Sequence, residues 1–425
     1  HLLYWRKAWW IVELCPRHSW SRLLVCCRFR RGFLKESSCR HVAEVLKKNQ
    51  RLRELYLSDG GINDVGIKLL SEGLKHPNCL LEKLRLYDEH LTKSCGECLA
   101  EVLRKNENLK ELALAPCEID DKGMELLCEG LKHPSCKLEK FWLRRGLLTG
   151  SSCRNLAEVL KKKQSLRELY LSDSGIHDEG IQLLCEGLKH PDCKLEKLWL
   201  SSVSLSLSHG RHLAEGLRQN QGLTELDLSH GTRDDTAFRY LCEGLKYPGC
   251  KLEKLRVFRG FLTTSQCREL ANVFRRSETL RELALGYCQI GKQEMVVLCE
   301  GLKHPNCKLE KLCFSTWNLR EFWCRHFGEI LTLSQSLKEL DLSPSDMDDG
   351  DLKLLCDGLK HPDCKLQTLR LTCCALTENC CKYLAEVLRE NQGLKELALS
   401  PSDKDDKAFE GLCEGLKHPG CKLEK

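Results

Sequence analysis

The residue types best suited to chemistry in this sequence are cysteine and histidine, which recur together in a His-Pro-x-Cys motif. A thiolate and an imidazole at this spacing could bind zinc or form a nucleophile with its base. However, the motif recurs at multiples of 57 residues, so its copies would lie roughly 16–20 Å apart, and each copy offers only two ligands. We therefore predict a structural role for these histidines: His76, His133, His190, His304, His361 and His418.

Two further groups of cysteines have spacings that could support redox or metal chemistry. The first is a CxxC motif at an expected helix start, where the helix dipole would lower a thiol pKa, and the second could converge on zinc. They are Cys95 and Cys98, and Cys373, Cys374, Cys380 and Cys381. The first group lacks a thioredoxin-like context, and two members of the second occupy regular repeat positions. Packing is therefore the favoured interpretation of both.

One segment approaches the pattern of a phosphate-binding loop. Residues 286–293 read GYCQIGKQ, which fits GxxxxGK but places Gln293 where a Ser or Thr would hold Mg²⁺. The same segment aligns with the ordinary turn of other repeat units. We therefore expect no ATP binding by this chain and no cofactor of any kind.

These residues are positioned by a repeat that begins with Leu-x-x-Leu-x-Leu, with an occasional Phe or Val. The pattern starts at Leu52 and recurs at alternating intervals of 29 and 28 residues up to Leu423, and one earlier copy starts at Leu24. In each unit a short alternating segment typical of a strand is followed by a polar turn and then by apolar residues at helical spacing. This predicts an α/β leucine-rich-repeat solenoid. Because helices need more width than strands, we expect a horseshoe with a concave parallel sheet and outer helices.

Both ends of the sequence depart from the repeat. We expect residues 1–23 to form an atypical N-terminal segment or cap, and residues 24–425 to form the leucine-rich-repeat domain. The last copy of the pattern stops three residues after it begins, and the sequence does not start with Met. Because solenoids need caps at their ends, we expect this domain to be truncated at its C-terminal end.

Composition excludes several classes of protein. No run of 18 apolar residues is present, and a net charge of +6 on 425 residues is too small to indicate nucleic acid. The 29 cysteines follow no secretory signal. Most occupy regular repeat positions, such as Cys79 before a strand, Cys128 and Cys153 in helices, and Cys288 at a strand's end. We therefore expect reduced, buried thiols in a cytoplasmic protein that binds neither membrane nor nucleic acid.

The alternating units, with the pattern LxELxLSxxxIxDxGxxLLCEGLKHPxCK, resemble ribonuclease-inhibitor-type leucine-rich repeats. They are most similar to the repeat domain of the NLR family, in the NACHT, LRR and pyrin-domain group. This resemblance implies non-catalytic recognition of ligands or partners in innate immune signalling, together with autoinhibition of the receptor. ATP would bind only to an upstream NACHT module, which is absent from this sequence.

The concave face holds the candidate binding residues. Counted from the first Leu of each strand, the second and third positions alternate in charge between neighbouring strands, so these charges are expected to satisfy each other. The fifth position is not fixed by the repeat, and in three consecutive strands it is aromatic. Exposed Trp, Tyr and Arg are typical of binding hot spots. We predict that a protein partner contacts Trp142, Tyr170, Trp199, Arg144, Arg145, Tyr56, Arg85 and Arg256.

Two functions remain open. The first is partner sensing by the repeat domain of a cytosolic NLR-type receptor, and the second is a free-standing, ribonuclease-inhibitor-like solenoid that blocks an enzyme. A basic ribonuclease would favour an acidic inhibitor, whereas this sequence has a pI of about 8.3. We therefore favour the receptor.

Overall fold

The computed structural model describes most of the repeat region. The described residues are 26–30, 36–58, 62–87, 93–115, 119–144, 148–172, 175–201, 203, 205–229, 234–258, 262–286, 288, 290–315, 321–343, 347–372, 377–399 and 406–424. The N-terminal segment 1–23 lies outside them. By its internal contacts the chain divides into two units, one of residues 1–203 and 219–223 and one of residues 204–218 and 224–425.

Each unit contains parallel strands that pair in chain order. In the described part of the first unit these are β1 (Cys26–Arg30), β2 (Glu54–Ser58), β3 (Lys83–Tyr87), β4 (Glu111–Leu114), β5 (Lys140–Arg144), β6 (Glu168–Ser172) and β7 (Lys197–Ser201). In the second they are β8 (Glu225–Asp227), β9 (Lys254–Phe258), β10 (Glu282–Gly286), β11 (Lys311–Ser315), β12 (Glu339–Asp341), β13 (Thr368–Leu371) and β14 (Glu396–Leu399).

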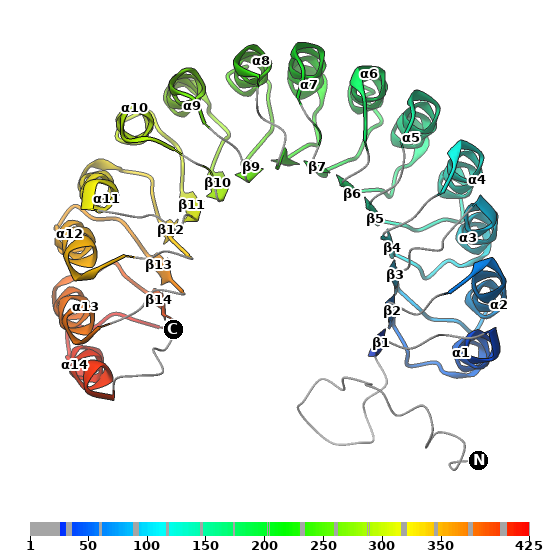
Figure 1. Cartoon of the computed structure of the whole chain (residues 1–425), viewed down its shortest axis with the longest axis horizontal. Helices are drawn as coiled ribbons and strands as arrows, with labels where there is room; N and C mark the ends of the chain where they lie inside the picture. Colours follow the sequence, from blue (N-terminus) through cyan, green and yellow to red (C-terminus); the bar gives the residue numbers. More distant parts are fainter. Residues whose placement is uncertain are drawn as a thin grey trace. The chain divides into compact units, whose positions relative to one another are not determined.

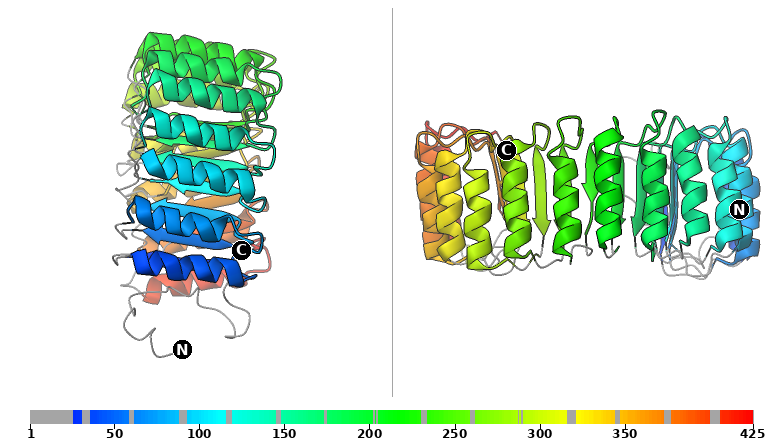
Figure 2. Two further views of the ribbon diagram at one scale, coloured as in Figure 1. Left: turned by 90° about the vertical axis from the view of Figure 1, so that its right-hand side faces the viewer. Right: turned by 90° about the horizontal axis from the view of Figure 1, so that it is seen from above.

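One helix follows each of these strands. The first unit contains α1 (Glu36–Lys48), α2 (Asp64–Leu74), α3 (Lys93–Lys105), α4 (Asp121–Lys132), α5 (Gly150–Lys162) and α6 (Asp178–Leu188). The second contains most of α7 (Leu207–Gln219), and α8 (Asp235–Leu245), α9 (Thr264–Arg276), α10 (Lys292–Leu302), α11 (Glu321–Leu333), α12 (Asp349–Leu359), α13 (Glu378–Glu390) and α14 (Asp406–Lys417). Within each unit the helices lie side by side on the outer face and the strands on the inner face (Figures 1 and 2). This confirms the leucine-rich-repeat solenoid.

The core of each repeat lies between its strand and its helix. In β3, Leu84 and Leu86 are buried against the helices, whereas Lys83, Arg85 and Tyr87 are half-buried on the opposite face. Side chains alternate across a strand, so the Leu-x-Leu spacing sends both leucines to the same side. The opposite side, here termed the concave face, is left for polar and aromatic residues.

The repeats alternate between 28 residues, here termed short units, and 29 residues, here termed long units. The helix of each short unit packs closely against the helix of the long unit that follows it. A β-carbon at Gly130 of α4 would lie 2.7 Å from the Cα of Ala100 in α3, and one at Gly187 of α6 would lie 2.9 Å from the Cα of Ala157 in α5. Real β-carbons do not approach other atoms so closely, so these positions need glycine. The 57-residue superperiod therefore corresponds to a pair of closely packed helices.

The histidine of the His-Pro-x-Cys motif closes the turn that follows a long-unit helix. The Ser135 backbone N–H donates a hydrogen bond to His133 Nδ1 at 3.3 Å, and the Cys136 N–H donates to the His133 carbonyl at 3.1 Å. The same side-chain acceptor is present in the other five copies: His76, His190, His304, His361 and His418. These contacts confirm the predicted structural role.

A buried asparagine closes the turn between a short-unit helix and the next strand. Asn106 donates from Nδ2 to the Leu74 carbonyl at 2.7 Å and accepts from the Asn108 and Leu109 N–H groups, each at 2.9 Å. Asn220 and Asn391 make the same three kinds of contact in their own repeats. One side chain thus satisfies three buried backbone groups and ties two repeats together.

The cysteines at regular repeat positions are free thiols and most are buried. Burial raises the pKa of Cys128, Cys153 and Cys299 to about 12, because the thiolate is disfavoured away from water. Cys288 is buried as expected at its strand's end, where its thiol donates to the Val257 carbonyl at 3.3 Å. Among the described regular positions, Cys421 is half-buried and Cys413 is exposed on α14, which packs on only one neighbouring described helix.

Thiol labelling tests this burial. In the native protein at neutral pH, a disulfide reagent is expected to modify Cys413 rapidly and to leave Cys128 and Cys153 unmodified. Raising the pKa from 9.0 to about 12 lowers the thiolate fraction about a thousandfold. Peptide mapping by mass spectrometry gives the rate at each site. Equal labelling of Cys128 and Cys413 before unfolding would contradict the assignment.

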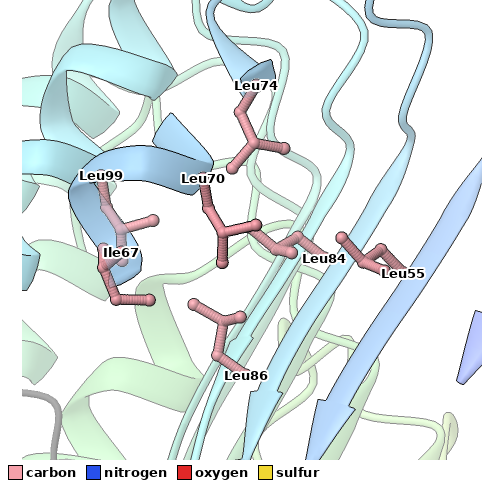
Figure 3. Close-up of a pocket in the computed structure, with 7 residues that line it drawn as sticks. All are labelled: Leu55, Ile67, Leu70, Leu74, Leu84, Leu86 and Leu99. Atoms are coloured by element: carbon pink, nitrogen blue, oxygen red, sulfur yellow. The ribbon is translucent and has the colours of Figure 1, made fainter. Parts of the chain in front are cut away.

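The first unit contains a small internal cavity of about 10 Å³ (Figure 3). Its lining is entirely aliphatic: Leu55, Ile67, Leu70, Leu74, Leu84, Leu86 and Leu99. This volume barely reaches that of one water, which would find no polar partner there. We interpret it as a gap in packing rather than a ligand site.

Candidate protein-binding surface

The strand register brings the predicted aromatic residues together. Trp142 of β5 pairs with Tyr170 of β6, and Tyr170 pairs with Trp199 of β7. All three occupy the same position of their repeat, so they extend from the sheet on its concave face, opposite the helices. The aromatic row predicted from the sequence is therefore present within the first unit.

The three rings pack together as one cluster. The Trp142 and Tyr170 ring centroids are 3.7 Å apart with nearly parallel planes, at 16°. Trp199 packs its edge on Tyr170 with a centroid distance of 4.4 Å. Tyr170 is only 6% exposed, whereas both tryptophans are half-buried. The expectation of an exposed Tyr170 is therefore wrong, because its neighbours cover it, and the surface that a partner could touch belongs mainly to the tryptophans.

Tyr170 is fixed by a hydrogen bond to a glutamate that is itself paired with two lysines. Its hydroxyl donates to Glu168 Oε2, and Glu168 Oε1 lies 3.0 Å from Lys197 Nζ and 3.1 Å from Lys140 Nζ. Burial tends to raise the pKa of Glu168, but hydrogen bonds from Tyr170, Lys197 and Lys140 outweigh it and lower that pKa. The carboxylate therefore stays charged and fixes the central ring.

Arg85 extends the cluster toward the N-terminal strands. Its guanidinium carbon lies 5.7 Å from the Trp142 ring centroid and 5.1 Å from that of Tyr56, which are cation–π distances. Glu111 Oε1 lies 2.5 Å from Arg85 Nη2 and fixes the side chain. The intervening strand contributes only Ala113, which is buried. Tyr56, Arg85, Trp142, Tyr170 and Trp199 thus form a continuous surface, here termed the concave aromatic stripe.

The other three predicted residues are not part of this stripe. Arg144 is exposed at the end of β5. Arg145 lies outside the described residues. Arg256 belongs to the second unit, where its Nη2 lies 3.3 Å from Glu225 Oε1. The stripe therefore combines five of the eight predicted residues.

The alternating charges of the concave face pair as expected. The third strand position forms the pairs Lys83–Glu54 at 2.7 Å, Lys254–Glu282 at 2.8 Å and Lys311–Glu339 at 2.9 Å. The second position forms Lys110–Glu82 at 3.1 Å, Arg167–Glu196 at 3.2 Å and Lys338–Glu310 at 2.7 Å. These pairs leave little free charge around the aromatic rings.

Sequence reasoning missed the two carboxylates that position the stripe. Glu168 and Glu111 belong to the alternating charge column, which had been assigned only to mutual neutralisation. The sequence did contain a signal for both. Glu168 stands two residues before Tyr170 on the same strand, and Glu111 lies on the strand beside that of Arg85. Charge pairing and aromatic positioning are therefore carried out by the same residues.

The described members of the two cysteine groups are buried or half-buried. Cys95 is buried, and burial raises the pKa of the half-buried Cys98, the reverse of what an activated thiol requires. Cys380 and Cys381 are buried in α13, and the Cys380 thiol donates to Asp349 Oδ1 at 3.2 Å. Cys373 and Cys374 lie outside the described residues.

Comparison with known proteins agrees with this fold. A model of the leucine-rich repeat matches residues 48–71, 105–128 and 162–185. The chain is 36% identical to mouse (Mus musculus) ribonuclease inhibitor over 92% of this chain and 86% of that protein. It is 40% identical to mouse NACHT, LRR and PYD domains-containing protein 12 over 75% of this chain. It is also 40% identical to human (Homo sapiens) NACHT, LRR and PYD domains-containing protein 3 over 65% of this chain.

Fold and repeats together define a leucine-rich-repeat protein. The chain belongs to the ribonuclease-inhibitor family of these proteins, and the leucine-rich-repeat regions of the NACHT, LRR and PYD proteins are its homologues. It spans only 30% and 27% of the length of the two NACHT, LRR and PYD proteins compared above. None of the helices that the structure describes combines the length and apolar character needed to span a bilayer.

Proposed function

We propose that this chain is a non-catalytic protein-recognition domain, the sensing arm of a cytoplasmic NLR-type innate immune receptor, and that its partner docks on the concave aromatic stripe. In this proposal the intact receptor binds ATP through a separate NACHT module, and the repeats hold it inactive until a partner binds. The observation that carries the proposal is the stripe of Tyr56, Arg85, Trp142, Tyr170 and Trp199.

The chemistry of the stripe supports protein binding. Trp, Tyr and Arg are the residues most enriched at interface hot spots, and large aromatic side chains lose little conformational entropy on binding. Here Glu111 anchors Arg85 and Glu168 anchors Tyr170 before any partner arrives. Such preorganisation lowers the entropic cost of association.

A catalytic role is not proposed. The charged side chains near the stripe are engaged in ion pairs, and burial holds the pKa of thiols such as Cys128 and Cys153 far above neutrality. Neither group is then available as an acid, a base or a nucleophile at neutral pH.

The second candidate is an inhibitor that binds and blocks a ribonuclease. It is favoured by the extent of the similarity to ribonuclease inhibitor, which covers 92% of this chain and 86% of that protein. Charge opposes it, because the carboxylates of the concave face are mostly paired with Lys or Arg and would attract a basic enzyme only weakly.

Site-specific crosslinking tests the docking face. A photo-crosslinking amino acid at Arg144, beside the stripe, is expected to capture a specific partner in cells, whereas the same probe at exposed Lys122 on helix α4 is expected not to. The captured protein is then purified and its affinity for the unmodified chain is measured. Equal capture from both positions, or no binding by the purified partner, would overturn the proposal.

Titration with pancreatic ribonuclease separates the two candidates. A receptor domain is expected to leave RNA cleavage unchanged at physiological salt. Stoichiometric inhibition of cleavage would instead establish the inhibitor.

A further inference from the structure

Six arginines gather on three neighbouring helices of the second unit, on the side opposite the concave face. They are Arg211 and Arg218 on α7, Arg239 on α8, and Arg268, Arg275 and Arg276 on α9. Five of the six are exposed and Arg275 is half-buried. This group, here termed the convex arginine cluster, has no role in the concave aromatic stripe.

None of the six arginines forms an ion pair with a carboxylate in the part of the chain that the structure describes, whereas basic residues at the same position of α1, α5 and α13 do. Lys161 of α5, for example, lies 2.9 Å from Glu158, and Lys47 of α1 lies 2.8 Å from Glu44. In α9 this glutamate is replaced by Asn272. Arg275 Nε is buried and has no hydrogen-bond partner among the described residues. The cluster therefore has uncompensated positive charge.

Two tyrosines, Tyr240 on α8 and Tyr247 in the turn that follows it, contact three of these arginines. Arg211 and Arg239 lie over the ring of Tyr240, with guanidinium carbons 5.5 Å and 5.7 Å from its centroid. Arg218 lies 6.0 Å from the ring centroid of Tyr247, which is 48% exposed. A guanidinium stacked on a ring still has its N–H groups free at the edge.

Both tyrosines depart from the repeat. At the position of Tyr240 the other long-unit helices have Leu69, Leu126, Leu183, Val297, Leu354 and Gly411, none of them aromatic. At the position of Tyr247 the other copies have His76, His133, His190, His304, His361 and His418. The substitutions thus occur in α8 and in the turn that follows it, between the two arginine-bearing helices α7 and α9. Their coincidence with the loss of Glu at Asn272 makes this a distinct surface rather than a feature of every repeat.

The arginines form a regular array. Arg211 and Arg218 are seven residues apart, so they share one helix face at a separation of roughly 10 Å. Arg268 and Arg275 occupy the same two positions 57 residues later. Adjacent packed helices lie about 8–10 Å apart. Discrete anionic groups spaced along an extended chain could therefore each meet a guanidinium.

We propose that the convex arginine cluster binds an acidic protein segment, whose Asp and Glu carboxylates pair with the guanidiniums while its backbone crosses α7, α8 and α9. A planar guanidinium donates two parallel hydrogen bonds to a carboxylate. Glu215, Glu243 and Glu269 lie on the same three helices as the arginines. A peptide whose carboxylates are spaced apart can place them on the arginines and away from these glutamates, whereas the uniformly charged backbone of a nucleic acid cannot. This surface is independent of the proposed concave-face function.

The test uses the full chain and a fluorescein-labelled peptide of alternating Glu and Gly, followed by fluorescence anisotropy at physiological salt. The triple variant R218Q/R239Q/R275Q is expected to bind the peptide about tenfold or more weakly, which is a loss of about 1.4 kcal/mol. The matched control K122Q/R154Q/K161Q removes the same number of charges from α4 and α5 and is expected to change affinity less than about twofold. Circular dichroism verifies that both variants are folded.

Two results would overturn the proposal. Equal weakening in the control variant would mean that the peptide responds only to net charge. Tighter binding of a single-stranded oligothymidylate than of the peptide would assign the cluster to nucleic acid instead. The triple variant R218K/R239K/R275K adds a second measurement, since it keeps the charge but loses bidentate pairing, and it is expected to bind with intermediate affinity.

Discussion

Replacing Trp142 and Trp199 together by alanine is expected to weaken binding of the concave-face partner about 100-fold or more. Each hot-spot tryptophan typically contributes about 2 kcal/mol or more, and each 1.4 kcal/mol corresponds to a tenfold change in affinity. Of the three clustered aromatic rings these two are the partly exposed ones, because Tyr170 is covered by its neighbours. Calorimetric titration with the purified partner measures the loss.

The control for this experiment removes two aromatic rings from the opposite face. Phe322 on α11 and Tyr383 on α13 are half-buried on the helical side, and the variant F322A/Y383A is expected to bind the partner with unchanged affinity. Thermal unfolding establishes that W142A/W199A is folded, since loss of ring stacking alone costs about 0.5–1.5 kcal/mol per pair. Unchanged affinity in the folded tryptophan variant would eliminate the stripe as the binding site.

The largest effect on stability is expected at Asn106. The variant N106A removes the hydrogen bond to the Leu74 carbonyl and leaves the Asn108 and Leu109 N–H groups without their side-chain acceptor. A buried polar group that loses its partner costs about 1–3 kcal/mol. Because water can reach part of the turn, we expect a total loss of about 2–4 kcal/mol, measured as a lower urea midpoint.

Ser277 provides a matched comparison at the same position of another repeat. Its hydroxyl accepts one hydrogen bond, from the Leu280 N–H at 3.2 Å, and it is buried like Asn106. S277A should therefore cost only about 1 kcal/mol. If the two variants unfold at the same urea concentration, the threefold hydrogen bonding of Asn106 does not stabilise the turn.

Much of the architecture could be predicted from single residues and their spacing. The Leu-x-x-Leu-x-Leu pattern predicted every described strand from β2 to β14, because a period of two must place its leucines on one face. Pro191 follows closely on the end of α6 at Leu188, as expected for a residue that cannot continue a helix. The buried turn asparagines escaped notice, although Asn106 and Asn220 each stand three residues before the first Leu of a strand motif.

The candidate surface was predicted less completely. The sequence predicts which residues line up in a column across the strands, because parallel strands of a strict repeat must pair position by position. Burial within the column does not follow, since it depends on how long side chains fold over one another. Arg85 reaches across Ala113 to Trp142, and this contact buries the alanine and joins two groups that the sequence leaves apart.

The sequence by itself thus determined the repeat, the order and direction of the strands, and which residues occupy the concave face, because each of these is a consequence of periodicity. Tertiary structure alone decided that Tyr170 is covered and the tryptophans are accessible. It also decided that Glu111 and Glu168 fix the stripe, and that the arginines of α7, α8 and α9 lack carboxylate partners among the described residues. The physical reason is that ring stacking and ion pairing depend on ångström-scale distances between side chains of different repeats. A pattern along one chain does not encode those distances.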